Sequence, residues 1–330
     1  MSWLKLATDL KKEIVELLDY ESRCNLRSCS KTDKEMVDST KPTAKKLRVM
    51  EIMSDMAVGK TIVRFDIDGF TIWFTGRENV TRIDRGWNGE MVEEFSETKQ
   101  RNRFELIGEF VDRFNKKGLT WVDSLVITSV RFAIPEAWNI KCHNLILRSI
   151  AIDHYMGWYR KLTSICKKFK HFEQREWGDW PESSQLVSEI QVTESFYIDH
   201  QLELTDEQLE NIEAIDLEIT SVNFTTEAAK KRLEKLLRLG NIEDQLMIHI
   251  PLPENFDSMK QIIPEEFITK KINADNLQDG EYKGKIIGGF KNIHGIQDPR
   301  ELEIEIFGDL VRVYCKVYRK EDNGFLMYPF

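Results

Sequence analysis

The chain has 330 residues, a length that usually holds two domains, or one large domain and a small module. Its composition, 41% hydrophobic and 31% charged, is typical of a folded protein and excludes a disordered or low-complexity one. The net charge of −9 argues against a protein that binds phosphate backbones with its whole surface, so we expect no nucleic-acid partner.

The beginning of the chain lacks the pattern of a secretory signal, because charged residues such as Lys5, Asp9, Lys11 and Glu13 interrupt it. The sequence also contains no run of eighteen apolar residues, so we expect no membrane span. These features predict a cytoplasmic or nuclear protein. The cysteines are odd in number and lack paired spacing, which predicts free thiols that act as small core residues. They are Cys24, Cys29, Cys142, Cys166 and Cys315.

The first predicted helix has an apolar stripe. Leu10, Ile14, Leu17 and Leu18 fall at positions i, i+4, i+7 and i+8, and the other face carries Lys11, Lys12, Glu13 and Glu16. Three short helices within about 40 residues cannot bury all their apolar surface, because domains near this size bury only about 60% of what the unfolded chain exposes. We therefore expect part of the stripe to need a partner.

Two further short helices follow. Ser22 is predicted to cap the second helix, and Thr32-x-x-Glu35 has the spacing of a capping box that opens the third. Pro42 closes the set. The predicted helical module therefore covers residues 1–46.

Residues 6–31 read LATDLKKEIVELLDYESRCNLRSCSK. This run resembles an F-box, in the form found in the large nematode F-box protein families. The resemblance implies a substrate-recognition subunit of a Skp1-cullin-F-box (SCF) ubiquitin ligase, in which the F-box binds Skp1, and through it cullin, while the rest of the chain holds a target protein. It implies a Skp1-facing or helix-holding role for Leu6, Leu10, Ile14, Leu17, Leu18, Leu26, Cys29 and Ser30.

The run departs from the family at two positions. The family usually has Leu-Pro where this chain has Leu6-Ala7, and Glu where it has Asp9. A proline in the first turn presets φ at no loss of hydrogen bonding, so Ala7 leaves a looser helix start. Two alternatives stay open: a stand-alone interaction scaffold whose F-box has decayed, and a helical subdomain that is folded onto the body.

Residues 47–98 are predicted to be a linking region rich in hairpins. Residues 61–67 alternate in polarity, Asp68-Gly69 is a strong turn signal, and residues 70–74 form the second strand. A helix follows, with Gly118 as its predicted C-terminal cap. Its apolar positions are Phe104, Ile107, Phe110, Val111 and Phe114.

Residues 99–330 are predicted to form an irregular, leucine-rich-repeat-like α/β body, so the fold class is α/β with a small N-terminal three-helix F-box. Short strands alternate with helices every 20 to 30 residues, and residues 127–132 agree with residues 219–224 at five of six positions. An irregular α/β layer with ordinary crossovers is the alternative. The strand cores are at 125–127, 145–147, 171–173, 190–192, 215–217 and 246–248, and the helices are at 155–169 and 226–239.

The second half of the chain also resembles the F-box-associated domain of the same nematode families. That resemblance implies that this part recognises the target protein. The chain is expected to end with two alternating strands, residues 301–308 and 310–318, which cover the edge of the sheet.

No recognised catalytic motif is present, so we expect no enzyme activity and no cofactor; a hydrolase or transferase without a recognisable motif is the least favoured alternative. Gly59-Lys60-Thr61 lacks the rest of a phosphate-binding loop. Cys142, His143, His154 and Cys166 lack the paired spacing of a zinc site, and we interpret the thiols as core residues.

Two aromatic clusters remain. Trp158 and Tyr159 lie near several lysines, which could bind single-stranded nucleic acid, although rings at this spacing are usually core. Trp177-Gly178-Asp179-Trp180-Pro181 is typical of an irregular loop, and we predict that Trp177 and Trp180 contact the target. The alternative is that both rings pack inward.

Overall fold

The computed structural model describes residues 3, 6–18, 20–40, 44–55, 60–77, 79–116, 121–175, 187–240, 244–251, 281–291, 297–307 and 310–319. The chain divides into two compact units, residues 1–169 (the first unit) and 170–330 (the second unit). The fold is mixed α/β, with three helices followed by many strands. Within the described residues, no helix has both the length and the apolar character needed to cross a membrane.

The chain opens with the three predicted short helices. They are α1 (Thr8–Leu17), α2 (Tyr20–Cys29) and α3 (Lys31–Ser39). The predicted caps are wrong. Ser22 lies inside α2, and the cap of α3 is Ser30, whose side chain accepts a hydrogen bond from the Asp33 N–H. Ser30 has an extended backbone (φ −156°, ψ 165°), and its side chain satisfies the Asp33 N–H at the start of α3. The helix is therefore capped two residues before Thr32, the predicted cap.

An antiparallel meander forms one side of the first unit's sheet. Its strands are β1 (Ala44–Asp55), β2 (Lys60–Ile67), β3 (Phe70–Arg77), β4 (Val80–Trp87) and β5 (Glu90–Lys99). The predicted hairpin at Asp68-Gly69 is confirmed, since both residues have positive φ, 48° and 93°, as a type I′ turn requires. Asn88-Gly89 repeats this geometry between β4 and β5, with φ of 51° and 88°.

Parallel strands extend the same sheet on the other side of β1. The helix α4 (Arg103–Lys116) leads into β6 (Trp121–Thr128), and β7 (Lys141–Arg148) follows. β1 pairs with β6 and β6 with β7, both in parallel. Within this unit the strand order is β7-β6-β1-β2-β3-β4-β5.

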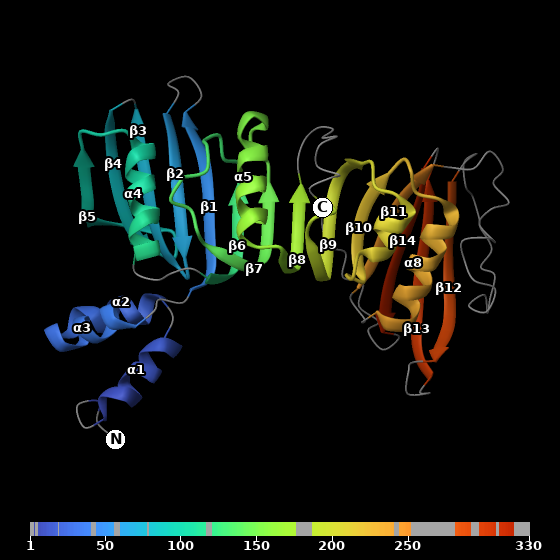
Figure 1. Cartoon of the computed structure of the whole chain (residues 1–330), viewed down its shortest axis with the longest axis horizontal. Helices are drawn as coiled ribbons and strands as arrows, with labels where there is room; N and C mark the ends of the chain where they lie inside the picture. Colours follow the sequence, from blue (N-terminus) through green and yellow to red (C-terminus); the bar gives the residue numbers. More distant parts are fainter. Residues whose placement is uncertain are drawn as a thin grey trace. The chain divides into compact units, whose positions relative to one another are not determined.

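Two helices cover one face of the first unit's sheet (Figure 1), and the core beneath α4 is aromatic. The ring of Phe110 in α4 lies 5.3 Å from that of Phe65 and 5.7 Å from that of Phe74, and four of the five predicted apolar positions of α4 are buried. The exception is Phe104, which is 38% exposed. Gly118, the predicted cap, lies outside the described residues.

The helix predicted over 155–169 is α5 (Ile152–Ile165), which ends earlier. Residues 168 and 169 belong instead to β8 (Lys168–Arg175), because Phe169 is buried as part of an alternating strand. The indole of Trp158 donates to the Phe132 carbonyl at 2.8 Å and lies 5.3 Å from the ring of Trp138.

The second unit continues the alternation of strands and helices. Its further elements are β9 (Gln191–Leu202), α7 (Asp206–Asn211), β10 (Asp216–Ser221), α8 (Thr226–Leu239) and β11 (Gln245–Pro251). Strands β9, β10 and β11 are parallel neighbours, and buried Phe196, Leu217 and Leu246 form one row across them. The capping box of α7 joins Thr205 to Gln208.

The end of the chain confirms the predicted C-terminal strands. β12 (Glu281–Lys291), β13 (Gln297–Phe307) and β14 (Leu310–Arg319) are antiparallel to one another. β14 pairs with β11, so these strands cover the edge of the parallel part, as predicted.

Candidate protein-binding site

Helix α1 has one apolar face that packs inside the helical module. Val15 is fully buried and forms a cluster with Met36 and Val37 of α3. Trp3 and Leu26 pack against the same cluster. The three helices therefore have a small core of their own.

A second apolar face of α1 remains accessible. Leu10 is 43% exposed and Leu17 is 86% exposed, while Ile14 is half-buried. Leu17 lies two residues after Val15, which places it about 200° around the helix and therefore on the opposite side. Leu10 and Leu17 are seven residues apart, nearly two turns, and share a side. We call Leu10, Ile14 and Leu17 the α1 stripe.

Arg23 of α2 joins the ends of the other two helices. Its side chain is buried; it donates to the Val15 carbonyl at 3.1 Å, to the Thr40 carbonyl at 3.1 Å and to the Thr40 hydroxyl at 2.6 Å. Burial lowers the pKa of the guanidinium, and the charge of Glu16 partly offsets this. Because Val15 lies in the last turn of α1 and Thr40 caps α3, the cation satisfies carbonyls at two C-termini and complements both helix dipoles.

Trp3 attaches the beginning of the chain to α3. Its indole N–H donates to Asp33 at 2.9 Å, and the Ser30 hydroxyl donates to the same carboxylate at 2.7 Å. These two hydrogen bonds, first that from Ser30, lower the pKa of Asp33. The ammonium of Lys11 lies 5.5 Å from the centre of the Trp3 ring, which adds a cation–π contact to α1.

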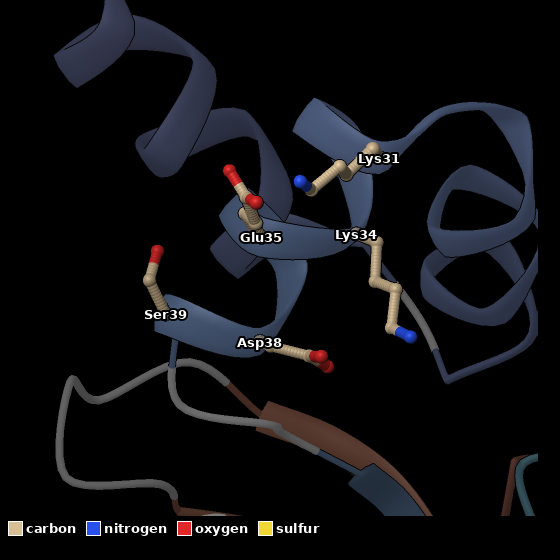
Figure 2. Close-up of a pocket in the computed structure, with 5 residues that line it drawn as sticks. All are labelled: Lys31, Lys34, Glu35, Asp38 and Ser39. Carbon is tan, nitrogen blue, oxygen red and sulfur yellow. The ribbon is translucent and has the colours of Figure 1, made fainter.

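The outer side of α3 is polar. Arg27 of α2 makes a two-point ion pair with Asp38, at 2.8 and 3.2 Å. Figure 2 shows a hollow whose lining carries both signs of charge, with Lys34 and Asp38 pointing one way and Glu35 and Ser39 another. Lys31 completes the set. All five lining residues are exposed, so this hollow is a feature of a charged protein surface and not an enclosed ligand site.

The eight predicted site residues differ in exposure and in packing. Leu10 and Leu17 are exposed, and Leu6, Ile14 and Leu18 are half-buried. Leu26 instead packs against the internal cluster. Cys29 and Ser30 are both exposed; the Cys29 thiol donates to the Asn25 carbonyl at 3.3 Å and Ser30 caps α3. The predicted target contacts Trp177 and Trp180 lie outside the described residues.

Sequence reasoning missed the groups that hold the helices together, namely Val15, Arg23 and Trp3. The periodic stripe that it followed is the accessible face, and Val15 stands next to Ile14 without a pattern of its own. A cation such as Arg23 among polar neighbours gives no signal of burial. Its role follows only from the approach of Val15 and Thr40 in space.

The cysteines are not all core residues. Cys142 and Cys166 are buried, the thiol of Cys166 lies 3.3 Å from the Cys142 carbonyl, and burial raises the pKa of the Cys142 thiol. Cys24 is half-buried and Cys29 is exposed, because both belong to a module too small to cover them. The side chain of Cys315 lies outside the described part.

The other chemical candidates find no site in the described ranges. There, no group of three or more His, Cys, Asp and Glu residues could hold a metal ion, and His143 instead contacts Asp123 at 3.3 Å. Trp158 and Tyr159 are fully buried and cannot stack on bases. Gly59 is outside the described residues, and Thr61 lies in β2.

Residues 3–45 match the protein family described as "F-box domain". These residues form an F-box domain. The match begins at Trp3, encloses all three helices and Thr40, which Arg23 contacts, and ends at Lys45, near the start of β1. A comparison with curated proteins finds none that matches the chain. The α1 stripe is thus an accessible apolar surface on an F-box.

Proposed function

We propose that the chain is the substrate-recognition adaptor of an SCF-type ubiquitin ligase, and that its F-box binds a Skp1-like protein through the α1 stripe. F-box proteins are generally non-enzymatic adaptors, and this chain needs no cofactor for such a role. One observation carries the proposal: the F-box has its own core around Val15, and yet Leu17 is 86% exposed. A monomeric protein gains nothing from this exposure, whereas a partner can bury it.

The energetics are sufficient for a specific complex. Burying Leu10, Ile14 and Leu17 contributes about 1.5 to 3 kcal/mol for each side chain that is fully covered. Leu10 and Ile14 are already partly buried, so their share is smaller, and the sum is comparable with the low end of the association cost, which is about 4 kcal/mol. Residues around the stripe then fix the orientation of the bound partner, as polar and half-buried neighbours do around a hot spot. We propose that these rim residues are Leu6, Leu18, Cys29 and Ser30.

The rest of the chain is the part that we propose holds the target. Strands β9, β10 and β11 are parallel neighbours in chain order, with helices α7 and α8 between them. This succession supports a leucine-rich-repeat-like body of the F-box-associated type, with functional parts at residues 1–46, 47–98 and 99–330. We place the protein in the cytoplasm or nucleus, where Skp1 and cullin act.

The test is co-purification of the full chain with Skp1. We expect the unmodified chain to form a complex and the double variant Leu10→Asp, Leu17→Asp to form none, because two carboxylates would then have to be desolvated at the interface. Leu239→Asp is the matched control, since Leu239 is 48% exposed at the end of α8, far from the F-box in sequence. An unmodified chain that ignores Skp1 would indicate a stand-alone scaffold with a decayed F-box.

A further inference from the structure

The described residues of the first unit cover only one face of its sheet with helices. Helices α4 and α5 both lie on that face (Figure 1), where Phe65 and Phe74 pack against Phe110. Successive residues of a strand point to opposite faces. Arg64, Asp66 and their neighbours in register therefore belong to the other face, which we call the helix-free face.

The strand register places the side chains of the helix-free face in rows. One row runs across six strands through Asp84, Trp73, Arg64, Met50, Thr128 and Arg148. The next row holds Thr71, Asp66, Arg48, Val126 and Ile146. Lys46 starts a third row beside Ser124 and Asn144, and Ile52 lies with Ile62 at the far end of β1.

The described part of this face is basic, although the whole chain carries a net charge of −9. Its cations are Lys46, Arg48, Arg64, Arg82 and Arg148. Its two carboxylates are already engaged. Asp66 accepts from the Nε of Arg64 at 2.9 Å, and Asp84 accepts from the Nε of Arg82 at 2.8 Å. Neither of these two ion pairs includes Lys46 or Arg48.

Lys46 and Arg48 are the cations open to a partner. Lys46 is exposed and Arg48 is half-buried, and neither makes an ion pair with any residue in the described ranges. Apolar side chains lie beside them on the same strand, with Met50 half-buried and Ile52 40% exposed. A partner would thus meet two cations and then two apolar side chains, at every second residue of one strand.

We propose that the helix-free face binds an acidic segment of the target protein, with carboxylates against Lys46 and Arg48 and apolar side chains against Met50 and Ile52. This inference rests on the proposed adaptor role and names the chemistry of the target. Nucleic acid fits the face less well, because base stacking needs an open ring. Trp73 is only 5% exposed and has the Arg64 guanidinium 5.7 Å from its ring centre.

The probe is a fluorescent synthetic peptide with two glutamates followed by two leucines at every second position and serines between them, so that all four lie on one face of an extended chain. It is compared with the counterpart that has glutamine for glutamate and with single-stranded oligo-dT. Binding to the full chain is followed by fluorescence anisotropy at low salt. We expect the glutamate peptide to bind, and the double variant Lys46→Gln, Arg48→Gln to bind it about tenfold more weakly. Arg113→Gln, Lys116→Gln is the matched control, because it removes the same charge from the exposed side of α4.

Equal binding of the glutamate and glutamine peptides would overturn the proposal, and so would an equal loss in the two double variants. Tighter binding of oligo-dT that is lost with Lys46 and Arg48 would assign the face to nucleic acid instead. Skp1 binding separates this proposal from the adaptor role, because the Lys46→Gln, Arg48→Gln variant should bind Skp1 as the unmodified chain does. If neither the unmodified chain nor this variant binds Skp1, but the variant still binds the glutamate peptide more weakly than the unmodified chain does, the adaptor role fails and the acidic-segment site stands.

Discussion

The F-box and the sheet of the first unit each have a covered face and an open face, but the two open faces differ in chemistry. On the sheet, the open face carries cations beside the apolar side chains of Met50 and Ile52, and its carboxylates Asp66 and Asp84 each pair with an arginine. On the F-box, the open face of α1 is apolar, and Leu17 is largely exposed to water. Charge can therefore select a partner of the sheet, whereas a partner of the F-box is stabilised mainly by the burial of apolar surface.

The largest effect should come from the residue that holds the F-box helices together. Arg23→Met removes the guanidinium donor from both Thr40 oxygens and from the Val15 carbonyl, which keeps only the Leu18 N–H, and we expect this to cost about 3 kcal/mol. Arg27→Met is the matched control on the same helix, since it removes a surface ion pair with Asp38 and should cost less than about 1 kcal/mol. Hydrogen exchange of α1 to α3 measures both. Similar protection in the two variants would contradict this role for Arg23.

The next effect separates the two faces of α1. Val15→Ala removes two buried carbons and should destabilise the F-box by about 2 kcal/mol. Leu17→Ala should change the free energy of unfolding by less than about 0.5 kcal/mol, because Leu17 is already exposed. Hydrogen exchange of the same helices reports both changes. A larger loss from Leu17 than from Val15 would reverse the assignment of the two faces.

A smaller effect tests the sheet in the same way. Asp68 at the β2–β3 turn accepts from the Lys45 N–H at 3.0 Å and from the Lys46 N–H at 2.7 Å. We expect Asp68→Ala to cost about 1 to 2 kcal/mol in urea unfolding, because it loses both bonds and keeps a positive φ that alanine disfavours. Asp68→Asn should lose less, since asparagine tolerates that φ and keeps one acceptor. Equal losses would show that the carboxylate does not anchor β1.

The smallest effect is a pH dependence at the start of the F-box. Hydrogen bonds from Ser30 and Trp3 lower the pKa of Asp33 in the folded chain, so their contribution is present above the ordinary pKa and is lost as the pH falls through the lowered value. The NMR signal of the Trp3 indole N–H should therefore titrate at acid pH below the ordinary range of aspartate. It should not titrate in Asp33→Asn. A titration that persists in that variant would mean that another group causes it.

Local patterns predicted much of the fold. Residues 226–239 form a helix, Asp68-Gly69 forms the turn, and the C-terminal strands lie where alternation indicated, because each depends on neighbours in sequence. The cap of α3 was misplaced because Ser30 and Thr32 both have an acidic residue three positions later. The early end of α5 was not predicted, because Phe169 fits both the helical period of about 3.6 residues and the strand period of two.

The site was predictable only where it follows a helical period. Leu10 and Leu17 share the open side of α1 as their spacing indicates. The packing of Leu26 against the internal cluster was not predictable, because it depends on where α3 lies beside α2. Arg23 was beyond prediction, since its three acceptors come from residues 15 and 40. The same holds for the helix-free face, whose rows join residues from six strands.

Whether Skp1 binds along α1 can be measured by hydrogen exchange of the full chain with and without Skp1. We expect the amides of α1, Thr8–Leu17, to exchange more slowly in the complex, while those of β2 and β3 keep the rates of the free chain. Unchanged exchange in α1 at saturating Skp1, or protection confined to the strands, would contradict it.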